Sequence, residues 1–236
     1  MALEVRMSLF LDRFGMASQE MDALLVPHPL RIETGIERLS GDVLRVEVRT
    51  DLPNCKGRML DWWFKEFDTT QHLLWWHPTD HVEHRGWSAQ WRKGRSYVGA
   101  TIRAVEALGA IPPVAAVIRF HDPRDAFSPG AYAAACQAGE VSLAIVARIG
   151  FGDDVALDAA GDPLQGAMVH VLRDTAFGAV LRSCFLLAPV EGKSVSDEIG
   201  LGLLQHCHCE FGYLSRCLPS LYWADPANRA DVPALW

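Results

Sequence analysis

The chain has 236 residues, of which 50% are hydrophobic and 22% are charged. These values are typical of a folded globular protein and exclude a disordered or fibrous chain. The formal net charge is −7, and an acidic chain lacks the clustered basic field that binds nucleic acids or anionic membranes. We therefore expect neither kind of partner. No run of about 18–20 apolar residues predicts a membrane span.

The N-terminal segment and the cysteines predict the compartment. The apolar residues at the N-terminus are interrupted by Glu4, Arg6 and Asp12, which is not the pattern of a secretory signal. The six cysteines are an even number, but a chain of this length can build a core without disulfides. We therefore expect reduced thiols and a cytoplasmic location.

Most of the chain is predicted to form strands. Residues Arg31–Thr50 predict two strands joined by a turn at Ser40-Gly41-Asp42. A short amphipathic helix is expected over Gly57–Phe67, where aromatic residues recur at helical spacing. Further strands are predicted, in chain order, at Val98–Leu108, Pro113–His121, Val141–Phe151, Met168–Leu172 and Gly178–Leu187.

The segment Ser194–Leu218 is the clearest predicted helix. Ser194 or Ser196 can cap it, and Asp197 lies in the first turn, where the helix dipole favours negative charge. Pro219 is expected just past its end.

This order of elements predicts an α+β fold in which a curved antiparallel sheet wraps around a long C-terminal helix. No repeat or low-complexity linker divides the chain. We therefore predict a single domain over residues 1–236, with an N-terminal extension at 1–30, a core at 31–218 and a C-terminal tail at 219–236.

The predicted long helix carries the first candidate site. His206 and Glu210 are four residues apart, so they share one helix face, and Tyr213 lies near that face. The string from His206 to Glu210 resembles a zinc knuckle, but neighbouring side chains on a helix diverge by about 100°. A polar stripe on the solvent side of the helix is the alternative explanation.

A second cluster runs from Trp75 to His84 and holds three histidines and two carboxylates. His77 and His81 are four apart and would share a helical face, with Pro78 at the first helical position. Imidazoles are the commonest metal ligands. A solvated surface turn is the alternative, but six of the eight tryptophans lie between Trp62 and Trp91, and so many rings need a wall to pack against.

Two predicted strands each place an ionisable residue among apolar ones. Glu106 shares one face of its predicted strand with Ala104 and Ile102, which are small or apolar. A carboxylate that faces the interior must be paired or bound to a metal. The alternative is neutralisation by an arginine such as Arg103. His170 lies between Val169 and Val171, where a lone histidine is more often structural than functional.

These segments together resemble the 2,4-diacetylphloroglucinol hydrolase family, which includes phloretin hydrolase. The resemblance covers roughly residues 36–213. It is carried by Thr50–Pro53, Met59–Phe64, Trp76–His81, Val98–Glu106, Ile118–Phe120, His170–Arg173, Gly178, Arg182-Ser183, Phe185, and His206 with Glu210.

The resemblance implies a fold and a metal site. Family members have a helix-grip fold similar to that of Bet v 1 and START proteins. They bind one zinc ion through two histidines and two glutamates and hydrolyse a carbon–carbon bond between an acyl group and a phenolic ring. Carried onto this chain, the ligands are His206, Glu210, Glu106 and a histidine of the His-Pro segment. We favour His77 for that position, with His81 as the alternative.

The resemblance also implies catalytic roles. His170 matches an active-site histidine of the family, and Asp80 occupies the place of a polar residue that contacts the substrate. We expect a zinc-activated water to attack the ketone and His170 to act as general acid, with His81 or Asp80 assisting.

The expected substrate is a flat aromatic ketone, either an acylated phenol or a β-diketone. Its binding site would be walled by aromatic residues, for which the candidates are Trp62, Trp63, Trp76 and Tyr213. We also allow for a homodimer.

Two other functions would use the same fold and the same binding site. One is a helix-grip protein that carries a hydrophobic aromatic molecule without reaction, and the other is a polyketide cyclase or dehydratase. Four convergent ligands favour an enzyme over a carrier. A set of two histidines and two glutamates does not by itself select zinc over Mn²⁺ or Fe²⁺.

Overall fold

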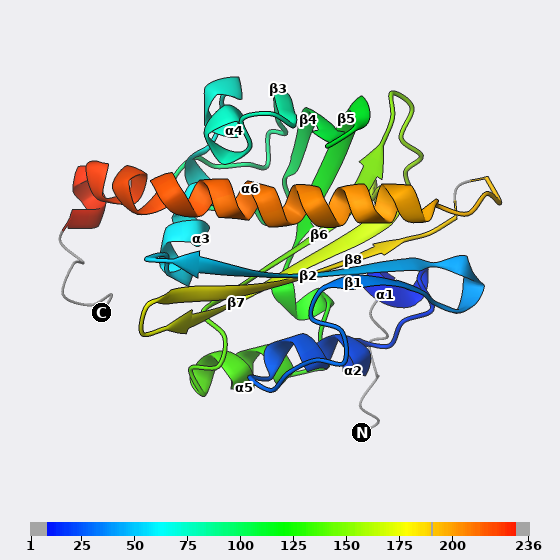
Figure 1. Cartoon of the computed structure of the whole chain (residues 1–236), viewed down its shortest axis with the longest axis horizontal. Coiled ribbons are helices and arrows are strands. Elements are labelled where there is room, and N and C mark those ends of the chain that lie inside the picture. The colour runs from blue at the N-terminus through cyan, green and yellow to red at the C-terminus, as the bar shows by residue number, and fades with distance from the viewer. Residues whose placement is uncertain (1–8, 190, 230–236) are drawn as a thin grey trace.

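The computed structural model describes residues 9–189 and 191–229, which form an antiparallel sheet of eight strands in the order β1-β2-β8-β7-β6-β5-β4-β3. The long helix α6 lies across one face of this sheet (Figure 1). The strands are β1 (Gly35–Arg38), β2 (Leu44–Pro53), β3 (His81–Trp87), β4 (Thr101–Leu108), β5 (Ile111–His121), β6 (Leu143–Phe151), β7 (Gly166–Thr175) and β8 (Gly178–Leu187). The predicted α+β helix-grip fold is confirmed.

The helices lie on both faces of the sheet. The face under α6 is called the concave face here, and α1, α2 and α5 lie on the opposite, convex face (Figure 1). The helices are α1 (Leu9–Asp12), α2 (Ser18–Met21), α3 (Gly57–Glu66), α4 (Thr70–Trp76), α5 (Ala131–Gln137) and α6 (Asp197–Ala224), with 3-10 turns η1 (Asp22–Leu25), η2 (Ser40–Asp42) and η3 (Pro123–Asp125). None of the described helices is long and apolar enough to cross a bilayer.

Strand alternation divides the apolar residues into two cores. In β7, Met168 and Leu172 pack on the concave face, whereas Val169 and Val171 pack on the convex face. Both faces of the sheet are therefore buried. His170 has the same parity as Met168, so the pleat directs it to the concave side.

The long helix begins as predicted but ends later. Ser196 caps it by accepting a hydrogen bond from the backbone N–H of Ile199. The expectation that Pro219 lies beyond the helix is wrong, because α6 continues through it to Ala224. A proline cannot donate to the carbonyl four residues earlier, and here the thiol of Cys55 donates to that carbonyl, Ser215 O, at 3.6 Å.

The predicted strands and the helix at Gly57–Phe67 are confirmed within a few residues at their ends. The predicted helix from His77 to His81 is wrong. The helix α4 precedes these residues, His77 is its C-cap, and His81 is the first residue of β3. The motif therefore forms a turn that reverses the chain from a helix into an edge strand.

The predicted N-terminal extension and C-terminal tail both contain helical residues. Residues 10–25 contribute apolar side chains to the convex core, and positions 219–224 belong to α6. Residues 1–8 and 230–236 of the predicted extension and tail lie outside the described residues. All six cysteines are free.

Candidate functional site

A cavity lies between the concave face of the sheet and α6. Its space between atoms, counted together with the open solvent at its mouth, is about 680 Å³. The lining is mostly apolar and aromatic. The polar exceptions are His81, Glu106, His170, His206 and Glu210, and no lysine or arginine is among the described residues that line it.

Four of these polar residues form one cluster, which three elements bring together. His206 and Glu210 project from one face of α6, while His81 on β3 is the register partner of Glu106 on β4. His81 Nε2 lies 3.6 Å from Glu210 Oε2 and 4.0 Å from Glu106 Oε1. Ligand atoms of His81, Glu106 and His206 all lie within 4.8 Å of one another. The arrangement can hold a metal ion.

Burial favours the uncharged form of each of the four groups in this cluster. Burial raises the pKa of Glu210 well above its ordinary value, and the nearby Glu106 and Asp80 raise it further. Burial also raises the pKa of Glu106, and it lowers the pKa of both His81 and His206 to about 4. Two enclosed carboxylates thus face two neutral imidazoles. A bound divalent cation would favour the ionised form of both carboxylates and use the lone pairs of the neutral imidazoles.

Asp80 lies next to the cluster and orients one of its histidines. Its Oδ2 accepts hydrogen bonds from the backbone N–H of Gly109 at 3.0 Å and from His206 Nδ1 at 3.1 Å. Burial opposes ionisation of Asp80, but these hydrogen bonds hold its pKa below the ordinary value. The bond to His206 leaves Nε2 as the ring atom that can face a ligand.

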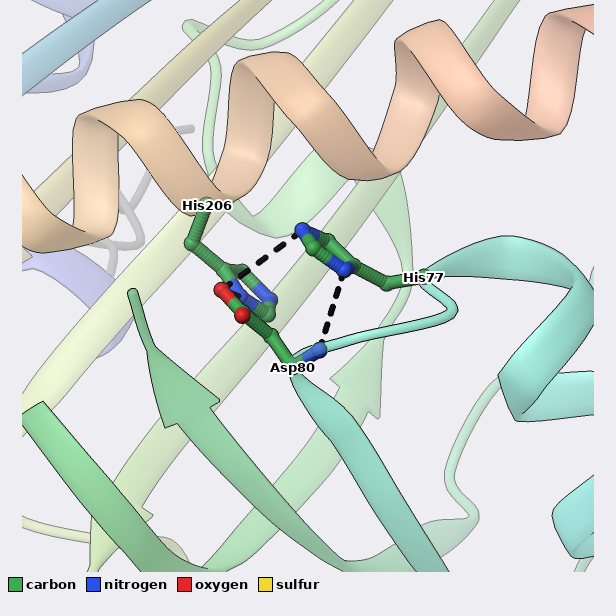
Figure 2. Close-up of side chains that lie close together, drawn as sticks. All are labelled: His77, Asp80 and His206. Atoms are coloured by element: carbon green, nitrogen blue, oxygen red, sulfur yellow. Dashed lines mark hydrogen bonds and ion pairs between the residues drawn. The ribbon is translucent and has the colours of Figure 1, made fainter. Parts of the chain in front are cut away.

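His77 occupies a different position. Its Nδ1 accepts a hydrogen bond from the backbone N–H of Asp80 at 3.1 Å, and its Nε2 lies 3.5 Å from Asp80 Oδ2 (Figure 2). The ring stacks on His206 with centroids 5.0 Å apart. Nε2 of His77 is buried without a hydrogen-bond partner, and His77, Asp80 and His206 form a second group with metal-ligand spacing.

His170 lies on the strand β7, outside this cluster. The ring is buried and packs edge-on against Phe185 and Phe211, with centroids 5.6 and 5.1 Å away. Its Nδ1 lies 2.7 Å from Ser183 Oγ. Burial lowers the pKa of His170 to about 3, so the ring is neutral at pH 7.

Only one of the predicted substrate-binding residues reaches the cavity wall. Trp76 lines it. Trp63 lies behind Trp76 in the core, with ring centroids 6.4 Å apart, and Trp62 turns away to donate a hydrogen bond to Asp225. Tyr213 packs edge-on against His77. The reason is that α3 and α6 direct these rings along helix faces that do not open on the cavity.

The sequence alone did not indicate several further residues of the site. It did not indicate the orienting carbonyl of Leu73, which lies 3.0 Å from His81 Nδ1, or the Ser183 hydroxyl beside His170. Only the strand register and the turn after α4 create these contacts. The aromatic wall that it did not indicate consists of Phe64, Phe67, Phe120, Phe151 and Phe185.

Three solved structures are similar to the chain at low identity. Ara h 8.0201 is 9% identical, with coverage of 75% of this chain and 99% of that chain and a TM-score of 0.46. Major latex-like protein 151 from Panax ginseng is 8% identical, with coverage of 73% and 98% and a TM-score of 0.44. Protein Ms6760 from Mycobacterium smegmatis is 12% identical, with coverage of 81% and 98% and a TM-score of 0.42.

No curated protein sequence matches the chain. The family model described as "DAPG hydrolase PhiG domain" matches residues 16–223. This match spans both the sheet and α6, and therefore every residue of the cluster. The chain belongs to the DAPG hydrolase family, which supports a hydrolase.

Proposed function

We propose that this protein is a zinc-dependent hydrolase that cleaves the carbon–carbon bond between an acyl group and a phenolic ring or β-diketone carbon. One observation carries the proposal. Two imidazoles and two enclosed carboxylates converge on the wall of an apolar, aromatic cavity. The family match adds the class of reaction.

The hydrogen bonds of each ring indicate which histidines can bind a metal. A ligating histidine normally donates its other N–H to an oxygen acceptor. His81 Nδ1 faces the carbonyl of Leu73, and His206 Nδ1 faces the carboxylate of Asp80. Both rings must therefore carry the proton on Nδ1, which leaves Nε2 with a free lone pair. We propose His81, Glu106, His206 and Glu210 as the ligands.

His77, the residue that the sequence favoured, has the opposite arrangement. Its Nδ1 faces a backbone N–H, so it must be the acceptor atom, and the proton of the neutral ring is then on Nε2, toward Asp80. Such a ring has no lone pair to offer from Nε2. We propose that His77 supports Asp80, which in turn orients His206.

A zinc ion held by this set would polarise a ketone and lower the pKa of a water molecule to about 7. The reaction adds water across the acyl–carbon bond: the acyl group leaves as a carboxylic acid, and the ring or diketone carbon takes up a proton. The departing carbon is carbanionic, so an adjacent carbonyl or phenol must delocalise its charge.

The chain's own residues bind and orient such a substrate. The aromatic wall excludes water and suits a flat, uncharged molecule, because no cationic side chain among the described lining residues would pair with an acid. Of the three residues predicted to be catalytic, His81 is one of the proposed ligands and Asp80 orients another, His206. His170 is neutral at pH 7, so we propose that it hydrogen-bonds the substrate instead of acting as the predicted general acid.

The test is metal content measured by elemental mass spectrometry, followed by hydrolysis of 2,4-diacetylphloroglucinol with acetate release as the readout. We expect about one zinc per chain in the wild type and in His77→Ala, and none in His81→Ala. Activity should follow the metal. A folded wild-type protein that binds no metal and releases no acetate would contradict the proposal and favour a carrier.

A further inference from the structure

Ser183 is the polar neighbour that determines the state of the His170 ring. It lies on β8 as the register partner of His170 on β7, and both side chains are directed to the concave face. Ser183 is fully buried and His170 is 2% exposed. Their 2.7 Å contact from Oγ to Nδ1 is a short hydrogen bond in an otherwise apolar environment.

The direction of this hydrogen bond decides what His170 presents to the cavity. If Nδ1–H donates to Ser183, then Nε2 carries a lone pair and can only accept. If the Ser183 hydroxyl donates to Nδ1, then Nε2 carries the proton and can only donate. The two cases select substrates with opposite polar groups at this position.

The surroundings of Ser183 favour the second case. Its hydroxyl interacts also with the buried thiol of Cys207, and sulfur is a much weaker acceptor than an imidazole nitrogen. The imidazole nitrogen is thus the better acceptor within reach of the hydroxyl.

We propose that Ser183 is a positioning residue that holds neutral His170 with its proton on Nε2, so that the ring donates a hydrogen bond to a substrate oxygen. This oxygen is the one that takes up negative charge when the acyl group leaves, such as a phenolic or second carbonyl oxygen. The substrate class narrows to ketones with an acceptor oxygen conjugated to the leaving carbon. The role of this hydrogen bond in catalysis rests on the proposed function, whereas the tautomer of His170 does not.

The tautomer is measured by NMR on the zinc-loaded protein labelled with ¹⁵N-histidine, and His170→Gln identifies the His170 signals by their loss. We expect a protonated Nε2 and an unprotonated Nδ1 for His170. His81 and His206 should show the opposite pattern, which makes them internal references. In Ser183→Ala the His170 signals should shift toward a mixture of the two tautomers.

Kinetics provide the second readout. Ser183→Ala should lower kcat by about tenfold, less than the roughly 10²–10³-fold that complete loss of a donor to a developing oxyanion costs, with a smaller change in KM and an unchanged zinc content. Ser183→Thr restores the hydroxyl and should recover activity. Ser215→Ala removes another buried hydroxyl, which donates to Gly212 O within α6, and should change neither the spectrum nor kcat.

The outcomes separate the two proposals. A protonated Nδ1 on His170 in the wild type, or an unchanged tautomer in Ser183→Ala, would overturn the role of Ser183 whatever the enzyme hydrolyses. A correct tautomer in a protein that cleaves no acyl phenol would instead overturn the proposed function.

Discussion

The two faces of the sheet both bury ionisable side chains, but they satisfy them differently. On the convex face, the Arg182 guanidinium donates to both carboxylate oxygens of Glu33 and to the carbonyls of Val26 and His28. On the concave face, Glu106 and Glu210 face neutral histidines, and no lysine or arginine is among the described residues that line the cavity.

The difference separates a structural role from a functional one. A buried charge with a full set of partners stabilises one arrangement of the chain, as Arg182 does by fixing the segment before β1. Buried acceptors without a cation raise the free energy of the fold until a proton or metal compensates them. The concave cluster is therefore the part of the sheet that we expect to bind an ion.

The largest expected effect comes from replacing a buried glutamate by glutamine on the concave face, with the same replacement on the convex face as its control. Glu210 on the concave side and Glu47 on the convex side are 7% and 8% exposed. Glu210→Gln should lose the metal and lower hydrolysis by more than about 100-fold, beyond the 10–100-fold typical of outer-shell changes. Glu47→Gln should keep both. Metal analysis and acetate release measure this, and equal activity in the two variants would refute the contrast between the faces.

The second effect concerns the stability that the buried, fully hydrogen-bonded Arg182 provides. Arg182→Met leaves Glu33 and two carbonyls without their donor, so the free energy of unfolding should fall by about 3 kcal/mol. Urea unfolding measures it, while activity per folded molecule should stay at the wild-type level. Arg124→Met is the control, because its side chain is 75% exposed beside Asp122 and an exposed ion pair contributes little to stability.

The pH dependence of stability tests Glu47 further. Burial raises the pKa of Glu47 to about 7 from 4.5, although Arg45 opposes the shift. The folded state therefore binds this proton more tightly than the unfolded state. Its stabilising contribution is complete below pH 4.5 and disappears as the pH rises through 7.

At 1.36 kcal/mol per pKa unit this contribution is about 3 kcal/mol at most. The unfolding free energy of the wild type, relative to Glu47→Gln, should thus fall between pH 4.5 and 8 in urea titrations. A difference that stays constant with pH would show that Glu47 does not titrate in this range.

The smallest effect concerns the helix that closes the concave face. Cys55→Ala removes the donor to Ser215 O and should cost about 1–2 kcal/mol. In a Pro219→Ala background the restored backbone N–H can bond that carbonyl, so the same change should cost about 1 kcal/mol less. A double-mutant cycle of unfolding free energies measures the coupling, with the exposed Cys136→Ala as a neutral control. Additive effects would exclude this role for Cys55.

Local sequence patterns were sufficient to locate the elements that have a clear periodicity or capping residue. Alternating or continuously apolar segments located β2 and the strands from β4 to β8, and the capping serines located the start of α6. The stop at Pro219 was wrong because a distant thiol, that of Cys55, satisfies the carbonyl that proline leaves free. No local signal in the sequence reports such a compensation.

The sequence by itself determined which residues can carry the chemistry. The four-residue spacing of His206 and Glu210 places both on one helix face, and strand alternation directs Glu106 and His170 inward, because helix and strand periods are local properties of the backbone. The tertiary structure alone decided how the remaining histidines are used. A turn after α4 and the pairing of β3 with β4 set His81 opposite Glu106 and turn His77 toward Asp80. Those contacts depend on register and hydrogen-bond partners far apart in the chain, which residue spacing does not encode.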